Sequence, residues 1–480
     1  MKIGIVSFTD PRPTAFAEER ENYIREHHNQ LKNFLIEKGF SVVDPMDEVK
    51  GDSEFFGIRS TEEVEKAGEI LKRDSADCLI LGLWHWTEPQ LPLNLVRSLN
   101  LPTLLFAEAD PTWAGSVCVS AVGASLWEAG ISLTHHRVLG DKEEVAKWAR
   151  GMLALQRLRK SSFLLWGGSY CLRMEHLQDD IPFLKSFLVG DILSEDQYIL
   201  IKKAEDIESN NPQRIEGFVN WLKENGAKIK YDGNMLTPEI FRKQVALYLA
   251  SKDRLEELKG ERIVGVSIKC QPELSEIYGV DACSIPAFLP FGEDSEGKRT
   301  PVATVCEGDI KGLLTCALLE GLQPSTPALF GDLKYISDDY IIISNCGASS
   351  IFYASHSNSA KDTLPHLTIA PQCQGKAGGA FGYDGKEGIL TVARLTRIDR
   401  EYVMQMGRGK ALPMREEIKK NILWGNTWPH IAIDLGVSRK RLVQIVGANH
   451  LCAIVGDFID ELKFACREAG IEVQEFSQGS

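Results

Sequence analysis

The chain has 480 residues, of which 44% are hydrophobic and 25% are charged, and its formal net charge is −13. This length suits about two to four domains, and the composition is typical of a folded globular protein, which excludes a largely disordered chain. A nucleic-acid-binding protein needs a basic stripe to neutralise phosphates. The basic cluster that stands out is the short run Arg439-Lys440-Arg441, so we expect no nucleic-acid partner.

The N-terminal run Met1–Phe8 is too short for the apolar core of a signal peptide. No stretch approaches the ~18 apolar residues of a membrane-spanning helix. We therefore expect a cytoplasmic protein that makes no membrane contact. The 11 cysteines are scattered singly, without a C-x-x-C pair. This spacing favours buried free thiols over disulfides and argues against a thiolate zinc site.

Residues 1–160 alternate between expected strands and helices. Strands are expected at 3–8, 40–43, 76–83 and 101–106, and helices at 13–38, 62–73 and 116–129. This rhythm predicts a Rossmann-like, doubly wound α/β domain with a parallel sheet. The first strand runs into Ser7-Phe8-Thr9-Asp10 and not into G-x-G-x-x-G, so an NAD-dependent dehydrogenase is not supported. The pair His27-His28 in the first helix is predicted to be exposed.

Residues 161–325 predict a second α/β domain. Strands are expected at 163–168, 262–269 and 301–306, and helices at 218–225, 238–251 and from 310. Asp309 stands at the N-cap position of the last helix. Glu307 therefore projects from the turn between a strand's C-terminal end and a helix, the edge at which ligands bind in open α/β sheets.

Residues 326–480 change in character to short apolar runs separated by glycine-rich turns. Strands are expected at 328–330, 340–344, 350–353, 367–370 and 388–394, before a final helix at 458–469. Closely spaced strands without intervening helices predict an antiparallel barrel or sandwich. The expected fold is thus of the α/β class: two doubly wound α/β domains followed by a C-terminal β-rich, antiparallel barrel-like domain.

Two acidic residues directly follow apolar runs: Glu307 in T-V-C-E-G-D and Asp332 in A-L-F-G-D. A buried carboxylate without a partner is costly, and a shared cation would satisfy both. His450 lies in V-G-A-N-H, and two carboxylates with one imidazole suit Mn²⁺, Mg²⁺ or a similar cation. From the residues alone the structural alternative stays open, in which Glu307 caps a helix, Asp332 lies in a turn and His450 is a core histidine.

Four segments resemble those of L-fucose isomerase and its relatives: I-K-C-Q at 268–271, C-E-G-D at 306–309, W-G-N-T-W-P-H at 424–430 and A-N-H at 448–450. The resemblance is best over residues 260–470 and extends to the order of the domains. It implies that Glu307, Asp332 and His450 hold Mn²⁺ or another divalent cation such as Co²⁺ or Mg²⁺. The related arabinose isomerases have a Glu where Asp332 stands and a further His, for which His356 is poorly placed, so we expect the three-ligand site of the fucose type.

The resemblance further implies that Gln271 and Asn449 contact the sugar. It predicts an aldose–ketose isomerase that acts on a free sugar, either L-fucose- or D-arabinose-like or a modified hexose such as a sulfonated one, through a cis-enediolate. Glu307 and Asp332 are the expected catalytic residues, one for the C2 proton and one for the hydroxyl proton, in an order that the sequence leaves open. The alternative is a non-catalytic sugar-binding or regulatory protein with the same fold.

The last candidates for substrate binding are aromatic residues. Trp84 and Trp86 follow a buried strand of the first domain. In the L-fucose isomerase family a Trp of this domain closes the site of a neighbouring subunit, so the resemblance implies a homo-oligomer, a hexamer or trimer, with shared sites and with Trp86 as a substrate-binding candidate. Trp424 and Trp428 are core residues by default and pocket walls if the resemblance holds; Trp424 is the second candidate.

Overall fold

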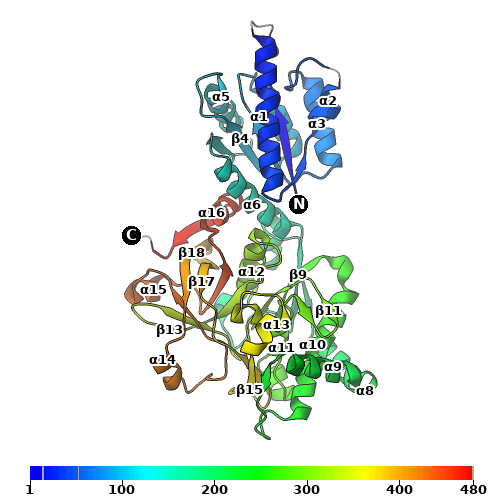
Figure 1. Ribbon diagram of the computed structural model, residues 1–480, viewed down its shortest axis with the longest axis vertical. Helices are drawn as coiled ribbons and strands as arrows, with labels where there is room; N and C mark the ends of the chain where they lie inside the picture. Colours follow the sequence, from blue (N-terminus) through cyan, green and yellow to red (C-terminus); the bar gives the residue numbers. More distant parts are fainter. Residues whose placement is uncertain (13–15, 52, 478–480) are drawn as a thin grey trace. The chain divides into compact units, whose positions relative to one another are not determined.

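The computed structural model describes residues 1–12, 16–51 and 53–477 (Figure 1). The expected start of the first helix, at 13–15, and the end of the expected third domain, at 478–480, lie outside the described residues. The chain divides into two compact units. The first holds residues 1–157 and 460–470, and the second holds residues 158–459 and the chain from 471. The domain boundaries expected near 160 and 325 stay predictions.

The first unit is built on a five-stranded sheet with the order β2-β1-β3-β4-β5, and all its pairings are parallel. The strands are β1 (Lys2–Ser7), β2 (Ser41–Val43), β3 (Cys78–Gly82), β4 (Thr103–Ala107) and β5 (His136–Leu139). The helices are α1 (Ala17–Glu37), α2 (Met46–Lys50), α3 (Thr61–Arg73), α4 (Gln90–Leu99), α5 (Gly115–Glu128), α6 (Lys142–Arg159) and α16 (Ile459–Ala469). Strands β3 and β4 are buried along their whole length, as continuous apolar runs in parallel sheets are.

The prediction that His28 is exposed is wrong. His28 is fully buried, its Nδ1 lies 2.8 Å from the hydroxyl oxygen of Ser7, and its Nε2 lies 3.1 Å from Oδ2 of Asp44. It occupies a helical stripe with Ile24 and Leu31, which are also buried in α1. This spacing is the signal that the sequence offered, because residues three and four apart share one face of a helix.

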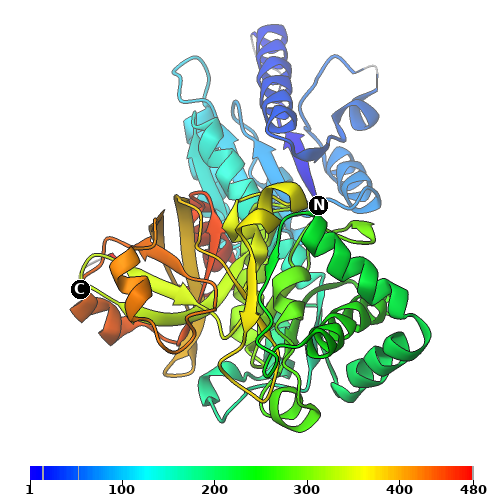
Figure 2. The ribbon, with the colours of Figure 1, turned by 60° about the horizontal axis from the view of Figure 1, so that its bottom comes forward.

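The second unit begins with a parallel sheet of the order β12-β9-β6-β7. Its strands are β6 (Ser162–Trp166), β7 (Asp191–Glu195), β9 (Ile263–Ile268) and β12 (Ala303–Cys306). Its helices are α7 (Ile181–Phe187), α8 (Tyr198–Asn210), α9 (Pro212–Glu224), α10 (Pro238–Glu257), α11 (Ser284–Phe288) and α12 (Ile310–Leu322). Helices α8, α9 and α10 pack on one another and are drawn in green in Figure 2. The loop expected at 290–298 carries a small hairpin, β10 (Glu293–Asp294) and β11 (Gly297–Lys298).

The rest of the second unit contains a closed antiparallel barrel. Its strands follow the order β17-β20-β13-β14-β19-β18, and β18 pairs with β17 to close it, while β21 joins β18 in parallel. The strands are β13 (Leu329–Ile336), β14 (Ile341–Ser344), β17 (Gly388–Ile398), β18 (Glu401–Leu412), β19 (Ile431–Asp434), β20 (His450–Val455) and β21 (Glu472–Glu475). The structure thus confirms the α/β class with parallel sheets and a C-terminal antiparallel barrel.

Shorter elements complete the second unit. A small sheet has the order β16-β15-β8, formed by β8 (Lys228–Ile229), β15 (Thr368–Pro371) and β16 (Gly379–Gly382). The remaining helices and turns are α13 (Ala360–Thr363), α14 (Glu416–Asn421), α15 (Arg439–Ile445), η1 (Glu175–Leu177), η2 (Lys259–Glu261), η3 (Glu273–Tyr278), η4 (Ile351–Ala354) and η5 (Leu364–His366). The strand expected at 350–353 is wrong, because this run forms the 3₁₀ turn η4. All four of its residues are buried, and a short, wholly buried apolar run does not distinguish a strand from a helical turn.

Helix α12 connects the parallel sheet to the barrel within the second unit. It packs against β9 and β12 on one side and against β17 and β20 on the other, and nearly all of its residues are buried. Asp309 is its N-cap, as predicted, since its Oδ1 accepts from the backbone N–H of Gly312 at 2.8 Å. The turn before α12 therefore lies where the carboxyl edge of the sheet meets the barrel. Among the described residues, no helix combines the length and apolar character needed to cross a lipid bilayer.

Candidate active site

Glu307 projects from a strained turn directly after β12. Its φ is 66°, in the left-handed region that residues other than glycine rarely adopt, and Gly308 follows with φ of 70°. The turn is held from both sides: the N–H of Glu307 donates to the carbonyl of Ile268 at 3.0 Å, and its carbonyl accepts from the N–H of Cys171 at 2.7 Å. Backbone strain of this kind persists only where the surroundings enforce it, and it is concentrated at functional sites.

Asp332 and His450 are brought together by the barrel. They are directly paired residues of the neighbouring antiparallel strands β13 and β20. The Nε2 atom of His450 lies 3.2 Å from Oε2 of Glu307 and 3.5 Å from Oδ1 of Asp332. The three predicted metal ligands, which are far apart in the sequence, thus form one cluster in which both carboxylates face the same ring nitrogen.

The other ring nitrogen of His450 is held by Asp309. Nδ1 lies 2.8 Å from Oδ2 of Asp309, and Arg394 donates to both oxygens of the same carboxylate, at 2.5 and 3.0 Å. All three side chains are fully buried. Burial raises the pKa of Asp309, but the charge of Arg394 and the hydrogen bond from His450 hold it below its ordinary value. Because the ionised carboxylate only accepts hydrogen bonds, Nδ1 carries the proton and the second nitrogen is turned toward Glu307 and Asp332.

The donor atoms of this cluster fit a divalent cation. Nε2 of His450 is buried and makes no hydrogen bond within the part of the chain that the structure describes, although two carboxylate oxygens lie close to it. An imidazole with two carboxylates is a donor set for cations such as Mn²⁺. An Asp that fixes the far side of the ring is the usual support of a metal-binding histidine.

The charges around His450 also favour a cation at this position. Burial by itself lowers the pKa of His450, but its hydrogen bond to Asp309 and its contact with Glu307 raise it to about 10. Burial also raises the pKa of Asp332, against the effect of the His450 charge. The cluster therefore favours a positive charge next to Nε2, which a proton or a bound cation can supply.

The two residues expected to contact the sugar through polar groups lie near the cluster. Asn449 donates to Oδ1 of Asp332 at 2.9 Å, and its own Oδ1 lies 2.8 Å from Nε2 of His176. Gln271 lines a small cavity together with Cys306, the residue before Glu307. Asn449 thus positions Asp332 in addition to any contact with a sugar.

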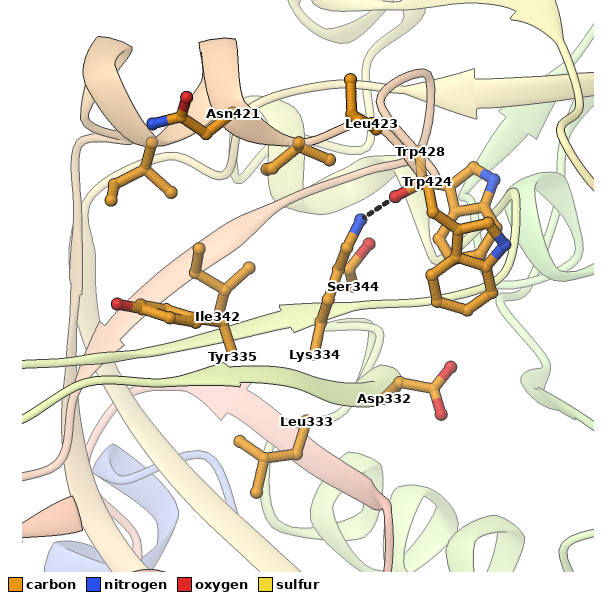
Figure 3. A pocket seen from close by; sticks show the side chains of 12 residues that line it. Asp332, Leu333, Lys334, Tyr335, Ile342, Ser344, Asn421, Leu423, Trp424 and Trp428 are labelled. Carbon is orange, nitrogen blue, oxygen red and sulfur yellow. Dashed lines mark hydrogen bonds between the residues drawn. The ribbon is translucent and has the colours of Figure 1, made fainter.

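A cavity of about 680 Å³ opens beside Asp332 (Figure 3). Trp424 and Trp428 form one wall, with ring centroids 4.5 Å apart, and Trp424 is 56% exposed. Lys334, which was not among the predicted site residues, extends toward these rings. Its Nζ donates to the carbonyl of Trp424 at 2.9 Å and lies 3.1 Å from Nε2 of His430. Burial lowers the pKa of Lys334 to about 8.

The tryptophans of the first unit differ from each other. Trp84 is 1% exposed and its Nε1 donates to the hydroxyl of Ser7 at 2.8 Å, so it is a core residue. Trp86 is half-buried within the same unit. Trp86 therefore stays the candidate for a contact with a partner subunit.

Arg394 and His176 were also missed in the sequence. Arg394 lies in the middle of β17, in a run of seven consecutive buried residues. The signal available in the sequence was its position within the largely apolar stretch from Leu390 to Leu395, since a strand buried on both faces reads as a near-continuous apolar run.

The fold thus joins parallel α/β sheets to an antiparallel barrel, with a carboxylate–imidazole cluster at the carboxyl edge of one sheet. Comparisons with known proteins show similarity to sugar isomerases. Residues 343–477 match the family model described as L-fucose isomerase, C-terminal domain, which confirms the predicted resemblance to that family. The chain is 22% identical over 227 residues to sulfoquinovose isomerases from Priestia aryabhattai and Priestia megaterium, covering 46% of this chain and 46% of each relative. A sulfoquinovose isomerase from Alkalicoccus urumqiensis is 24% identical over 160 residues, 33% of this chain and 32% of the relative. The chain spans about half the length of the curated relatives it matches.

Proposed function

We propose that this protein is a divalent-metal-dependent aldose–ketose isomerase. The observation that carries the proposal is the convergence of the Glu307 and Asp332 carboxylates on Nε2 of His450, with Asp309 fixing the opposite ring nitrogen. The match to the L-fucose isomerase C-terminal domain and the names of the relatives support the same class of reaction. Mn²⁺ is the cation that we propose, and Co²⁺ or Mg²⁺ would suit the same donors.

A bound divalent cation would supply Lewis-acid polarisation of the sugar's carbonyl and hydroxyl oxygens. The protein's own groups must then move two protons. One carboxylate takes the proton from C2 and returns it to C1, and the other exchanges the hydroxyl proton. We assign these two roles to Glu307 and Asp332. The strained turn aims Glu307, and Asn449 holds Asp332 through the hydrogen bond to its Oδ1.

The proposed substrate is a sugar with an anionic substituent, such as a sulfonated hexose. The relatives are named sulfoquinovose isomerases. In this chain the cavity beside Asp332 contains one feature that suits an anion, the Lys334 ammonium, which lies two residues along β13 from Asp332 and over the ring of Trp428 (Figure 3). Charge-assisted hydrogen bonds to a sulfonate are stronger than those to a neutral hydroxyl.

We also propose that the protein acts as a homo-oligomer, a hexamer or trimer, in which Trp86 of one subunit covers the sugar bound by another. Trp86 is half-buried within its unit, and this leaves part of its ring for such a contact. Aromatic faces pack well on the C–H face of sugars because they bury apolar area without breaking hydroxyl hydrogen bonds.

The substitution Glu307→Gln tests the proposed function. It keeps the size of the side chain and removes its charge and its basicity. We expect turnover to be lost while far-UV circular dichroism and the melting temperature stay close to those of the wild type. Retained turnover would refute the catalytic role. A wild-type protein that binds a sugar tightly with Mn²⁺ present, but never forms ketose, would instead establish the non-catalytic sugar-binding protein.

A further inference from the structure

Glu307 has a second polar contact, made by its other carboxylate oxygen. While Oε2 faces His450, Oε1 lies 3.6 Å from Sγ of Cys346. The thiol of Cys306 completes the group, because one donor atom from each of Cys306, Glu307 and Cys346 lies within 4.8 Å of the others. We call these three residues the thiol cluster. One carboxylate oxygen of Glu307 thus faces the imidazole of His450, and the other faces a thiol.

The distance between Cys346 and Glu307 suits two ligands of one soft cation in tetrahedral coordination. With Zn–S of about 2.3 Å and Zn–O of about 2.1 Å, two donors at the tetrahedral angle lie about 3.6 Å apart. The observed separation of Cys346 Sγ from Glu307 Oε1 is 3.6 Å. Two thiolates and one carboxylate also match the preference of Zn²⁺ and Cd²⁺ for sulfur donors, which Mn²⁺ and Mg²⁺ do not share.

There is room for an ion next to the two thiols. A cavity of about 20 Å³ is lined by both cysteines of the thiol cluster and by polar residues, among them Asn345 and Gln271. That volume is about what one water molecule needs, and a cation occupies less. The amide of Asn345 lies 3.4 Å from Sγ of Cys306 and holds this thiol in place.

We propose that Cys306, Cys346 and Glu307 form a binding site for one soft divalent cation, Zn²⁺ or Cd²⁺. Each thiol gives up its proton to solvent as its sulfur binds, so uptake of the cation releases protons. The sequence argued against such a site because the cysteines are not closely spaced. The fold brings Cys306, at the end of β12, next to Cys346, which lies two residues after the end of β14.

The test is a Cd²⁺ titration of the full chain, followed by the ultraviolet absorption of cadmium–thiolate bonds. A Cys373→Ser background removes a cysteine that is exposed and would add weak binding. We expect one tightly bound Cd²⁺ per chain, with proton release. Affinity should fall at least tenfold in Cys346→Ser and in Cys306→Ser. Cys270→Ser is the matched control and should bind as the background does, because Cys270 lines the same small cavity without belonging to the thiol cluster.

Circular dichroism of each variant separates loss of binding from loss of fold, and Cys346→Ala offers a second removal of the same thiol. The proposal is overturned if no cadmium–thiolate absorption appears, or if it persists unchanged in folded Cys346→Ser. The readout needs no sugar and no turnover. Binding of Cd²⁺ at the thiol cluster can therefore succeed or fail independently of the proposed isomerase activity.

Discussion

Nδ1 of His450 lies 2.8 Å from Oδ2 of Asp309, and this contact determines which ring nitrogen faces Glu307 and Asp332. Asp309 is at once the N-cap of α12, the partner of Arg394 and the support of His450. One carboxylate therefore connects the start of a helix, a barrel strand and the candidate metal cluster. Changes at this buried group should affect both the stability of the fold and the affinity for a cation.

Asp309→Asn separates these roles. The amide oxygen can still cap α12, but the charge that faces Arg394 is lost. We expect the free energy of unfolding to fall by about 3–5 kcal/mol, because an unpaired buried guanidinium remains. Affinity for Mn²⁺ should fall about 10–100-fold, because His450 loses the carboxylate that orients it. Urea denaturation and Mn²⁺ titration measure the two effects. Asp434→Asn, at an exposed end of β19, is the control. An unchanged Mn²⁺ affinity in folded Asp309→Asn would contradict the support role.

Lys334→Gln tests recognition of the anionic substituent. If Lys334 binds a sulfonate, kcat/KM for a sulfonated hexose should fall by about 10–100-fold, which corresponds to roughly 1.5–3 kcal/mol for a hydrogen bond to a charged group. The kcat/KM for an uncharged sugar that the protein also turns over should change little. Lys410→Gln, which removes an exposed lysine of β18, serves as the control. Equal losses for both sugars would show that Lys334 only maintains the pocket.

A mixing experiment tests whether subunits share sites. Trp86→Ala and Glu307→Gln are each expected to lower activity strongly. In mixed oligomers, some sites combine Trp86 from one subunit with Glu307 from another. With random assembly of equal amounts, about one quarter of the sites should be complete and activity should return. This prediction requires that each variant alone is inactive. If the mixed oligomers then stay as inactive as the separate variants, both residues belong to the site of a single subunit.

The raised pKa of Asp281 predicts that the free energy of unfolding depends on pH. Burial raises its pKa to about 6 from an ordinary value of 3.8, although hydrogen bonds from Cys283 and Gln244 lower it. The folded state therefore holds this proton more tightly than the unfolded state does. The resulting stability is fully present below about pH 4 and is lost as the pH rises through 6, a change of about 3 kcal/mol.

Asp281→Asn removes this titration. Compared with the wild type, the variant should gain relative stability as the pH rises from 4 to 7, as measured by urea denaturation at each pH. Asp206→Asn, on the exposed face of α8, should run parallel to the wild type. A difference in stability between Asp281→Asn and the wild type that does not change with pH would contradict this, because it would mean that the pKa of Asp281 is the same in the folded and unfolded states.

Local sequence patterns were sufficient to predict the strands and the helix start that carry the candidate site. The apolar runs before Glu307 and Asp332 indicated buried strands, and the structure has β12 and β13 there. Asp309 was placed correctly as a helix cap, because a cap depends on residues only three positions apart. The closely spaced strands predicted the barrel. Its closure depends on the long pairing of β17 with β18, and the short apolar runs of the sequence did not indicate strands of that length.

Contacts between side chains that are far apart in the chain could not be predicted from the sequence. Arg394 reaches Asp309 across 85 positions, and Cys346 reaches Glu307 across 39. Nothing near these residues indicates their partners, since each pairing exists only once the barrel has closed onto α12. His28 is a mixed case: its helical spacing with Ile24 and Leu31 indicated a buried face, but its partner Ser7, which lies in the sheet, could not be predicted locally.

The most direct test of the isomerase proposal is ketose formation by the EDTA-treated protein, assayed before and after Mn²⁺ is restored, on a panel of aldoses that includes sulfoquinovose and L-fucose. We predict that one sugar, carrying an anionic group, is converted to its ketose only when Mn²⁺ is present. Conversion that is indifferent to EDTA and Mn²⁺, or a protein that binds no Mn²⁺ and converts no sugar, would contradict it.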